Sequence, residues 1–315
     1  MRNKIGVIGA GLVGATAAFA LSQSGLASEI VLIDANAQRA QGEALDIEHG
    51  AALAPPVLVR DGDYPDLADA HLVIIAAGAN QKSGETRLDL AQKNLAVIDS
   101  IVPQVARYAP ECVLLVVSNP VDVLTWRAAE LAGFAEGRVL GSGTVLDTAR
   151  LRTLLSRHTR VDPRNVHAYV LGEHGDSSFV PWSCAQIASV KLEDYRKGLN
   201  YRDHVYPEFS YDEIEQYMRT SGAKIIGRKG ATFYAIAISV CHIVEVLFGS
   251  TNTVMTVSSM MHGEYGLDDV CLSIPFIVGP EGICGNILPP LTDEELVKMR
   301  HSGDVLKGVI AQLDI

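Results

Sequence analysis

Proton exchange is the first chemistry that the residues of this chain indicate, through one histidine and one aspartate. His174 lies between glycines in the segment LGEHGD (residues 171–176), at the end of an expected strand, where a cleft is the usual surrounding. Asp147 lies on an expected helix that follows Gly143. A carboxylate that accepts a hydrogen bond from one imidazole nitrogen fixes the tautomer and favours the protonated ring, so the other nitrogen can exchange a proton near neutral pH. We therefore predict a proton relay between Asp147 and His174.

Arg150 is the candidate for anion binding on the same helix. It stands three residues after Asp147, so the two side chains lie on one helix face and can pair with each other. If Asp147 is committed to His174, the guanidinium is free to hold a substrate carboxylate through two parallel hydrogen bonds. We predict the second arrangement, with Arg150 as a carboxylate clamp.

A glycine pattern near the start of the chain indicates dinucleotide binding. Gly9, Gly11 and Gly14 form G-x-G-x-x-G, with Val13 inside it, between an expected strand and an expected helix. The first glycine permits a tight turn, the second admits a pyrophosphate, and the third lets helix and strand pack closely. Asp34 follows twenty residues after Gly14, where its carboxylate can accept hydrogen bonds from both ribose hydroxyls and disfavours a 2′-phosphate. The pattern predicts NAD as the cofactor.

A nicotinamide site, a carboxylate clamp and a proton relay together predict hydride transfer at a carbon that bears a hydroxyl group next to a carboxylate. The alternative from another class is a non-catalytic nucleotide-binding or structural protein on the same fold. Hydride transfer is favoured because a protein without catalytic activity would not need several polar side chains that converge on one site.

Two domains are expected to position these groups. In the first half of the chain, short β-branched segments alternate with helix-length segments, as in the βαβ units of a parallel sheet. The expected strands are residues 4–9, 29–34, 57–60, 71–78, 112–118 and 138–141. We predict a doubly wound parallel (Rossmann) sheet that binds NAD in residues 1–143, and a catalytic α+β domain in residues 144–315, with a cleft between them.

The composition of the 315 residues excludes several classes of protein. Hydrophobic residues make up 48% and charged residues 20%, which a low-complexity or disordered chain would not show. The net charge of −11 repels phosphate backbones and anionic lipid, so no nucleic-acid or membrane partner is expected. The apolar stretch 231–249 carries Thr232, His242 and Glu245, and is expected to be a buried helix and not a membrane span.

The cysteines and the first residues of the chain bear on its compartment. Five cysteines without a C-x-x-C pair indicate free thiols and a reducing environment. The first 27 residues superficially imitate a secretory signal, but a signal peptide has no use for the glycine spacing of residues 9–14. The chain is therefore expected to be cytoplasmic, and no metal site is expected.

Five ordered segments closely resemble the L-lactate dehydrogenase and malate dehydrogenase superfamily, in particular its bacterial type. They are GAGLVG at 9–14, SNPVD at 118–122, GSGTVLDTAR at 141–150, LGEHGDS at 171–177 and KGATFYAIA at 229–237. The resemblance extends over essentially the whole chain. It implies an NAD-dependent oxidoreductase of small 2-hydroxy acids that assembles as a homotetramer, or at least as a dimer.

The resemblance also implies a role for each matched position. Catalysis is assigned to His174, Asp147 and Arg87. Arg87 ends a loop of residues 78–87, which closes so that this arginine polarises the substrate carbonyl. Substrate binding is assigned to Arg150, Gln81, Asn119 and Thr232. Cofactor binding is assigned to Gly9, Gly11, Val13, Gly14, Asp34, Gly78, Asn119 and Ile236.

Gln81 is the position that separates the substrates within the superfamily. Malate dehydrogenases resemble this loop but have an arginine there, whereas lactate dehydrogenases have glutamine. Beside Gln81, a dicarboxylate would bring an unpaired charge into a poorly hydrated site, a penalty on the order of several kcal/mol. Pyruvate and L-lactate are therefore the expected pair. The alternative is malate or a longer, branched 2-hydroxy acid, with residues near Thr232 deciding the size of the side chain.

Arg152 and His167 match positions that bind fructose 1,6-bisphosphate between subunits in allosteric bacterial members of the superfamily. Isolated basic residues are more often solvated surface charges. Both interpretations, an effector site and plain surface charge, stay open on the sequence.

Overall fold

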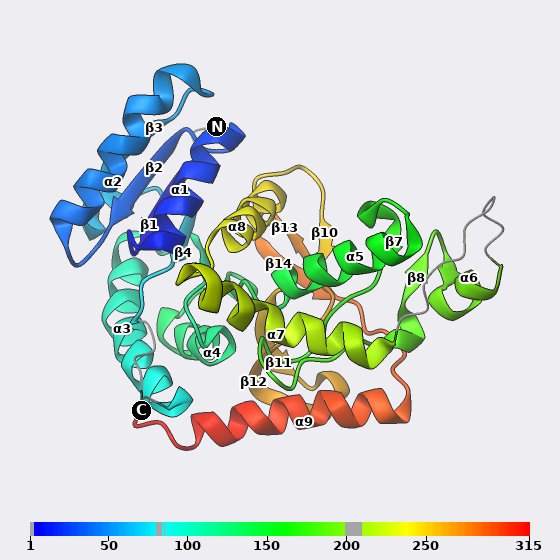
Figure 1. Ribbon diagram of the computed structural model, residues 1–315. Helices are drawn as coiled ribbons and strands as arrows, with labels where there is room; N and C mark the ends of the chain where they lie inside the picture. Colours follow the sequence, from blue (N-terminus) through cyan, green and yellow to red (C-terminus); the bar gives the residue numbers. More distant parts are fainter. Residues whose placement is uncertain (1–2, 80–83, 85, 199–209) are drawn as a thin grey trace.

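Short runs of β-branched residues and leucine in the first half form the parallel strands of one large sheet (Figure 1). The computed structural model describes residues 3–79, 84, 86–198 and 210–315 of the chain. Strands that are buried on both faces have continuous apolar sequences, such as VLLV in β5 (Val113–Val116). The other parallel strands are β1 (Lys4–Ile8), β2 (Glu29–Ile33), β3 (Leu58–Asp61), β4 (Leu72–Ile75) and β6 (Val139–Gly141).

The strand order of the large sheet is β12-β11-β6-β5-β4-β1-β2-β3. From the neighbouring strands β1 and β4, the chain winds outward in one direction through β2 and β3 and in the other through β5 and β6. The prediction of a doubly wound parallel sheet is confirmed. Ligands of such sheets bind at the carboxyl ends of the strands where the winding direction changes, which here is beside β1 and β4.

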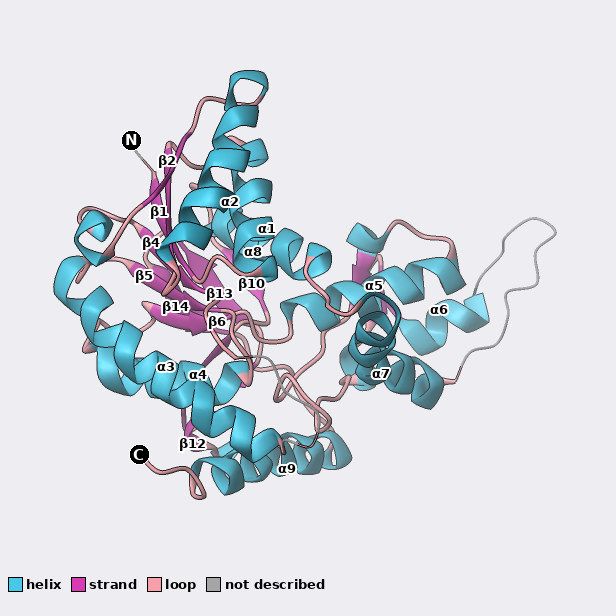
Figure 2. Ribbon diagram, turned by 60° about the vertical axis from the view of Figure 1, so that its left-hand side comes forward, coloured by secondary structure: helices cyan, strands magenta, loops and turns pink. Residues whose placement is uncertain are grey.

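Helices cover both faces of this sheet (Figure 2). One face packs on α1 (Leu12–Ser24) and α2 (Ala37–Gly50), and the other on α3 (Arg87–Tyr108) and α4 (Val121–Ala132). The start of α3 is fixed by a capping box, in which the side chains of Thr86 and Asp89 each bind the other's main-chain N–H.

The second half of the chain contributes two strands to the same sheet. β11 (Ser258–His262) pairs antiparallel with β6 through Ser258 and Gly141, and β12 (Asp268–Ser273) pairs with β11. The sheet therefore continues across residue 143, where the sequence pattern changes.

The rest of the second half mixes helices with two small antiparallel sheets, as predicted for an α+β domain. Its helices are α5 (Val145–Thr159), α6 (Leu192–Gly198), α7 (Tyr211–Lys229), α8 (Tyr234–Leu247) and α9 (Asp293–Ile310). One small sheet is β10 (Thr253–Met255), β13 (Phe276–Gly279) and β14 (Gly282–Asn286), and the other is β7 (Val166–His167), β8 (Gln186–Ile187) and β9 (Val190–Lys191).

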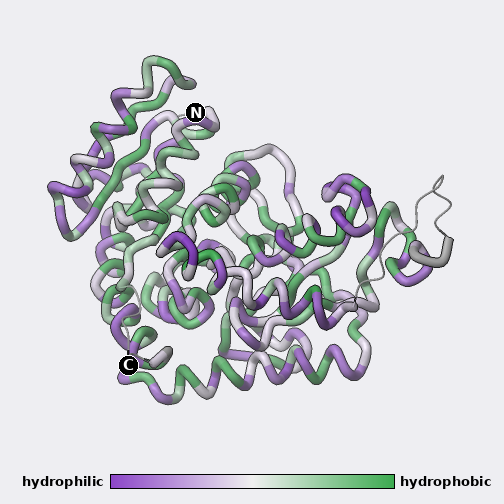
Figure 3. The backbone as a smooth tube through the Cα atoms, viewed as in Figure 1, coloured by the Kyte–Doolittle hydropathy of each residue, from purple (hydrophilic) through white to green (hydrophobic). Residues whose placement is uncertain are grey.

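The largest apolar core runs through both halves of the molecule. It joins residues of β1, α1 and β2 to residues of α8, β12 and α9. Hydrophobic residues gather in the central strands, whereas outer helices such as α9 alternate hydrophobic and hydrophilic residues (Figure 3). Among the described residues, no helix is both long and apolar enough to cross a bilayer.

Candidate active site

His174 and Asp147 lie together, as the sequence predicts. Asp147 is in the first turn of α5, and its Oδ2 atom lies 2.6 Å from Nδ1 of the His174 ring. The His174 side chain is 29% exposed and that of Asp147 is 12% exposed, so the ring faces outward from a buried carboxylate. Nδ1 is committed to Asp147, and Nε2 is therefore the nitrogen that is left to exchange a proton with a ligand.

Buried hydroxyl groups fix α5 against the segment that leads to His174. Thr144, which precedes α5, donates its hydroxyl to the carbonyl oxygen of Val170 at 2.5 Å. The N–H of Val170 donates in turn to the hydroxyl oxygen of Thr148 at 3.0 Å. Buried hydrogen bonds of this kind restrict movement, because breaking one leaves an unsatisfied polar group. The relay is thus held by main-chain contacts on both sides.

The electrostatics of the pair favour a charged imidazole. Burial lowers the pKa of His174, but the Asp147 charge and its hydrogen bond outweigh burial and raise this pKa to about 9. Burial likewise opposes ionisation of Asp147, yet the charges of His174 and Arg150 keep the pKa of this carboxyl below its usual value. At neutral pH the pair is an imidazolium beside a carboxylate.

Arg150 lies on the same side of α5 and contacts the relay. Its Nη1 atom donates to Oδ1 of Asp147 at 2.8 Å, while Oδ2 of the same carboxylate holds His174. On the sequence, the pairing of Asp147 with Arg150 and its pairing with His174 are alternatives, but the structure has both at once. A guanidinium has five N–H donors, so one bond to Asp147 leaves donors for a ligand carboxylate.

Asp122, which is not among the residues predicted from the sequence, contacts His174 from the other half of the chain. Its Oδ2 atom accepts the main-chain N–H of His174 at 2.6 Å, and its Oδ1 atom accepts the hydroxyl of Ser258 at 2.6 Å. The residue ends the SNPVD segment, and an aspartate at the start of an expected helix is usually read as an N-terminal charge only.

The glycine-rich turn after β1 has the geometry that the pattern predicts. Gly9 has a φ of +101°, and a side chain there would collide with the backbone of Ala77 after β4. A side chain on Gly14 would collide with the carbonyl oxygen of Gly9. At Gly11, in contrast, an added Cβ would meet nothing within 4 Å. Gly9 and Gly14 thus let the chain pack closely, and Gly11 leaves open space in front of α1.

Asp34 lies at the end of β2 and supports this turn. Its Oδ2 atom accepts the N–H of Ala10 at 2.7 Å, and its Oδ1 atom accepts the N–H of Asn36 at 2.9 Å. Each carboxylate oxygen can accept more than one hydrogen bond, so ribose hydroxyls can still bind here. The position of Asp34 beside Ala10 places its charge next to the open space at Gly11.

Asn94 of α3 joins the loops that follow β4 and β5. It is 2% exposed, its Oδ1 atom accepts the N–H of Ala79 at 2.7 Å, and its Nδ2 atom donates to the carbonyl oxygen of Asn119 at 2.7 Å. Gly78 packs against the same amide, and the Asn119–Pro120 peptide bond is cis. Nothing in the sequence pattern distinguishes Asn94 from other polar residues of this helix.

The remaining predicted residues make no side-chain hydrogen bond described here, or lie outside the described part of the chain. Thr232 precedes α8 and Ile236 lies in its first turn, both partly exposed, with Ile236 packed against the main core. Val13 is also partly exposed, in the first turn of α1. Gln81 lies outside the described residues, as do residues 80, 82, 83 and 85 of the predicted loop. Arg87 begins α3, but its side chain is outside the described part of the structure.

Arg152 of α5 contacts the residue that follows β7, the strand that contains His167. The Nε atom of Arg152 donates to the carbonyl oxygen of Ala168 at 3.1 Å, and its guanidinium lies over the ring of Tyr169, 4.9 Å from the centroid. Arg152 lines a cavity of about 330 Å³ between α5 and α8, whereas His167 is exposed on the strand.

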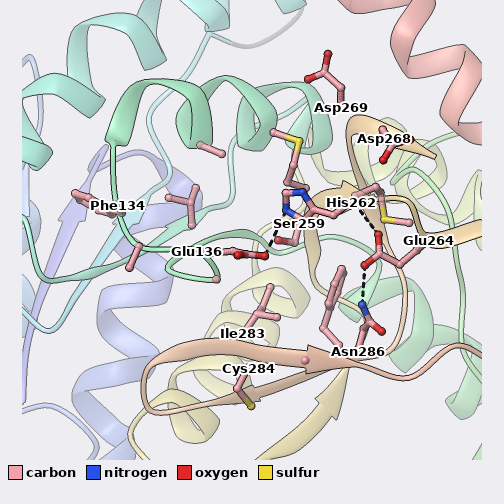
Figure 4. Close-up of a pocket in the computed structure, with 18 of the residues that line it drawn as sticks. Phe134, Glu136, Ser259, His262, Glu264, Asp268, Asp269, Ile283, Cys284 and Asn286 are labelled. Atoms are coloured by element: carbon pink, nitrogen blue, oxygen red, sulfur yellow. Dashed lines mark hydrogen bonds and ion pairs between the residues drawn. The ribbon is translucent and has the colours of Figure 1, made fainter. Parts of the chain in front are cut away.

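A second cavity, of about 700 Å³, lies away from the relay, at the C-terminal end of α4 and along β11 and β14 (Figure 4). It is rich in acidic residues, among them Glu136, which lies 3.6 Å from the ring of His262, and Glu264, which accepts the amide of Asn286. None of the predicted site residues lines it. In the described ranges, no three His, Cys, Asp or Glu side chains are grouped so that they could hold a metal ion.

Known proteins are similar to this chain over nearly its whole length. Residues 3–141 match the family model described as lactate/malate dehydrogenase, NAD binding domain, and residues 144–314 match the alpha/beta C-terminal domain of the same family. An L-lactate dehydrogenase of Acetivibrio thermocellus is 48% identical over 313 residues, covering 99% of this chain and 98% of the relative. One of Thermoanaerobacterium saccharolyticum is 46% identical over 319 residues, covering 99% and 100%.

Solved structures with the same fold include two lactate dehydrogenases. One, from a Medee basin deep-sea metagenome library, has a TM-score of 0.92 and 38% identity and covers 99% of both chains. The other is a minor L-lactate dehydrogenase from Enterococcus mundtii in a ligands-bound form, with a TM-score of 0.94 and 37% identity, covering 100% of this chain and 99% of that one.

Proposed function

The chain belongs to the lactate/malate dehydrogenase family, and from this premise we propose that it interconverts pyruvate and L-lactate with NAD as the cofactor. The observation that carries this proposal is the contact of His174 with Asp147, beside Arg150, at one helix end. The curated relatives reported above are named L-lactate dehydrogenases, which supports the same substrate pair. The meeting of these three side chains also disfavours a non-catalytic protein on this fold.

The residues around the glycine turn fit NAD. α1 begins at Leu12 without a side-chain cap and without an acidic residue in its first turn, so its N–H groups can bind a pyrophosphate placed in the open space at Gly11. Asp34 would bind the ribose hydroxyls and repel a 2′-phosphate. Gly9, Gly14 and Val13 would shape the turn, and Gly78, Asn119 and Ile236 would line the nicotinamide side. When bound, the reduced cofactor supplies the hydride.

His174 would hold and release the proton of the reaction. With Nδ1 bound to Asp147 and the ring charged at neutral pH, Nε2–H can donate to the carbonyl oxygen of pyruvate. Asp147 keeps the ring orientation and stabilises its charge. In lactate oxidation the neutral ring accepts the proton at the same atom.

Arg150 would orient the substrate through its carboxylate. The bond from Nη1 to Asp147 holds the guanidinium in place, so the remaining donors are directed before the substrate arrives. Arg87, at the start of α3, is proposed to polarise the carbonyl, and Asn119 and Thr232 to contact the substrate. Hydrogen bonds aimed at the developing charge lower the barrier more than they strengthen ground-state binding.

Gln81 would select pyruvate over oxaloacetate. The test is NADH oxidation with the two 2-oxo acids in parallel, and with a His174→Asn variant to identify background activity. We expect pyruvate to be turned over about a hundredfold faster than oxaloacetate at low concentration. Equal or faster turnover of oxaloacetate would overturn the lactate assignment in favour of malate. Faster turnover of a branched 2-oxo acid would indicate a wider pocket near Thr232.

The protein is further proposed to be a homo-oligomer, with a tetramer implied by the resemblance. Large apolar side chains are exposed on the adjacent helices α1 and α8: Leu12 (53%), Phe19 (53%), Tyr234 (66%) and Ile238 (66%). Surfaces of this kind are usually covered by a partner. Sedimentation equilibrium tests this, and a monomer at micromolar concentration would contradict it.

Fructose 1,6-bisphosphate is proposed as an activating effector held by Arg152 and His167. The cavity beside Arg152 also has Arg164 and His242 in its lining, which supports binding of an anion, although Arg164 is paired with Asp162. If saturating bisphosphate leaves the pyruvate concentration dependence unchanged, Arg152 and His167 are surface charges only.

A cytoplasmic location is proposed as well, in keeping with five free cysteines.

A further inference from the structure

Asp122 is a buried acid that the proposed reaction does not use. It lies in the first turn of α4 and is 3% exposed. Its two oxygens bind two segments of the other half of the chain, the main-chain N–H of His174 and the hydroxyl of Ser258, each at 2.6 Å. Ser258 begins β11 and is fully buried. The carboxylate therefore stands where α4, β11 and the His174 segment meet.

We propose that Asp122 is a positioning residue for the proton relay: its carboxylate anchors the main chain of His174 to β11 and places a second negative charge beside the imidazolium. This role rests on the proposed function, because it concerns the proton that His174 exchanges. It differs from the role of Asp147, which holds the ring itself. Asp122 would act only through His174.

A structural role alone does not account for an ionised group at this place. Burying a carboxylate costs free energy, and an asparagine could accept the same main-chain N–H without that cost. The charge is useful only if something nearby is positive. Among the described residues, His174 is faced by Asp147 and Arg150 from α5 and by Asp122 from α4. Asp122 is faced in turn by Glu173, next to His174, and by Cys271 from β12.

The balance of these groups favours an effect on His174. Burial lowers the pKa of the ring, Asp147 raises it most, Asp122 raises it further, and Arg150 lowers it. Burial raises the pKa of Asp122 itself to about 6, against the hydrogen bonds from Ser258 and the His174 N–H. Asp122 is therefore ionised at neutral pH and loses its charge in mildly acidic solution. Activity should then fall on the acidic side as Asp122 is protonated.

The test compares Asp122→Asn with the native protein. The amide keeps the shape and can still accept the His174 N–H, but it removes the charge. We expect kcat for pyruvate reduction to fall about tenfold or more, and the alkaline limb of the pH profile to move down by about 0.5 to 1 pH unit. The acidic limb near pH 6 should disappear. Ser258→Ala keeps the carboxylate but removes one anchor and one hydrogen bond that favours its charged form, so it should lower kcat, move the acidic limb up and shift the alkaline limb less.

Asp99→Asn is the matched control. Asp99 of α3 accepts from Arg127 of α4 at 2.7 Å, so this variant also removes one aspartate charge from a contact of α4. Its pH profile should match the native one. A second readout is independent of pyruvate: the rate at which diethyl pyrocarbonate modifies His174, followed by peptide mass mapping against pH. This titration should move down in Asp122→Asn and not in Asp99→Asn.

The outcomes separate the two proposals. An unchanged His174 titration and pH profile in Asp122→Asn would overturn the positioning role. A fall in kcat accompanied by a clearly lower thermal midpoint would also overturn it, because the fall would then come from general destabilisation. If the native protein does not reduce pyruvate, the proposed function fails. The His174 titration would still decide the role of Asp122.

Discussion

The first turns of α4 and α5 each carry an aspartate, yet the pKa values of the two are shifted in opposite directions. Asp122 and Asp147 are both buried, and both contact His174. Burial dominates at Asp122, whose pKa rises to about 6, whereas the charges of His174 and Arg150 overcome burial at Asp147 and lower its pKa. The difference lies in the partner: Asp122 binds a main-chain N–H and a hydroxyl, and Asp147 binds an imidazolium and a guanidinium.

Depth of burial alone therefore does not decide which acid is easily ionised in this site. Asp147 is stabilised as an anion because its counter-charges are buried with it. Asp122 has neutral donors only, so it keeps its charge at a cost. Replacing each partner in turn should show how far the two acids differ.

The largest effect should come from removing the ring that both aspartates contact. His174→Asn leaves the two acids without the imidazole, and we expect kcat for pyruvate reduction to fall at least about a thousandfold, since no group remains to donate the proton. NADH affinity, measured by fluorescence titration, should stay within about twofold of native. A comparable loss of NADH binding would contradict the role assigned to the ring.

Breaking the stronger of the two acid contacts should have the next largest effect. Asp147→Asn removes the charge that most favours imidazolium and permits the wrong tautomer, so kcat/KM should fall about 10² to 10³-fold. The pH profile of kcat/KM would report a lower His174 pKa. A smaller loss than in Asp122→Asn would reverse the proposed order of the two aspartates.

Arg150→Lys changes the cation beside Asp147 and leaves the charge in place. A lysine is a point charge and cannot form two parallel bonds with a carboxylate, so KM for pyruvate should rise about 10 to 100-fold. The change in kcat should be smaller. Initial rates measured over a range of pyruvate concentrations give KM and kcat separately. An unchanged KM would exclude Arg150 as the carboxylate clamp.

The last test, and the most direct one of the opposite shifts, measures stability and not turnover. A carboxyl whose folded pKa is raised contributes stability at low pH that is lost as pH rises through that pKa, so Asp122→Asn should gain stability relative to native as pH rises from about 4 to about 6, by about 3 kcal/mol. Asp147 has the opposite sign. Its contribution is present above the ordinary Asp pKa and is lost as pH falls through the depressed one.

Urea unfolding of both variants at several pH values measures these slopes. Asp147→Asn should be less stable than native at neutral pH, with the difference shrinking in acid. If the two differences from native change with pH in the same direction, the contrast between α4 and α5 is wrong.

The sequence predicted the parts of the site that depend on local spacing. The glycine turn, and the placing of Asp147 and Arg150 on one face of α5, require only spacing within one short segment. The roles of these residues came from the family resemblance. The contact of Asp122 with Ser258 joins residues 136 positions apart, and it depends on the pairing of β11 with β6, which no periodicity shows. Asn94 was missed for the same reason, since its bonds reach loops that follow two different strands.

The continuity of the large sheet bears on whether either half could be produced alone. A fragment ending near residue 143 would carry β6 without its neighbour β11, and the other fragment would carry β11 without β6. Exposed strand edges pair with other chains, so both fragments should aggregate. The first fragment would also keep Asp122 without its two donors. Although the family models divide the chain at residues 141 and 144, its halves are expected to fold and unfold as one unit.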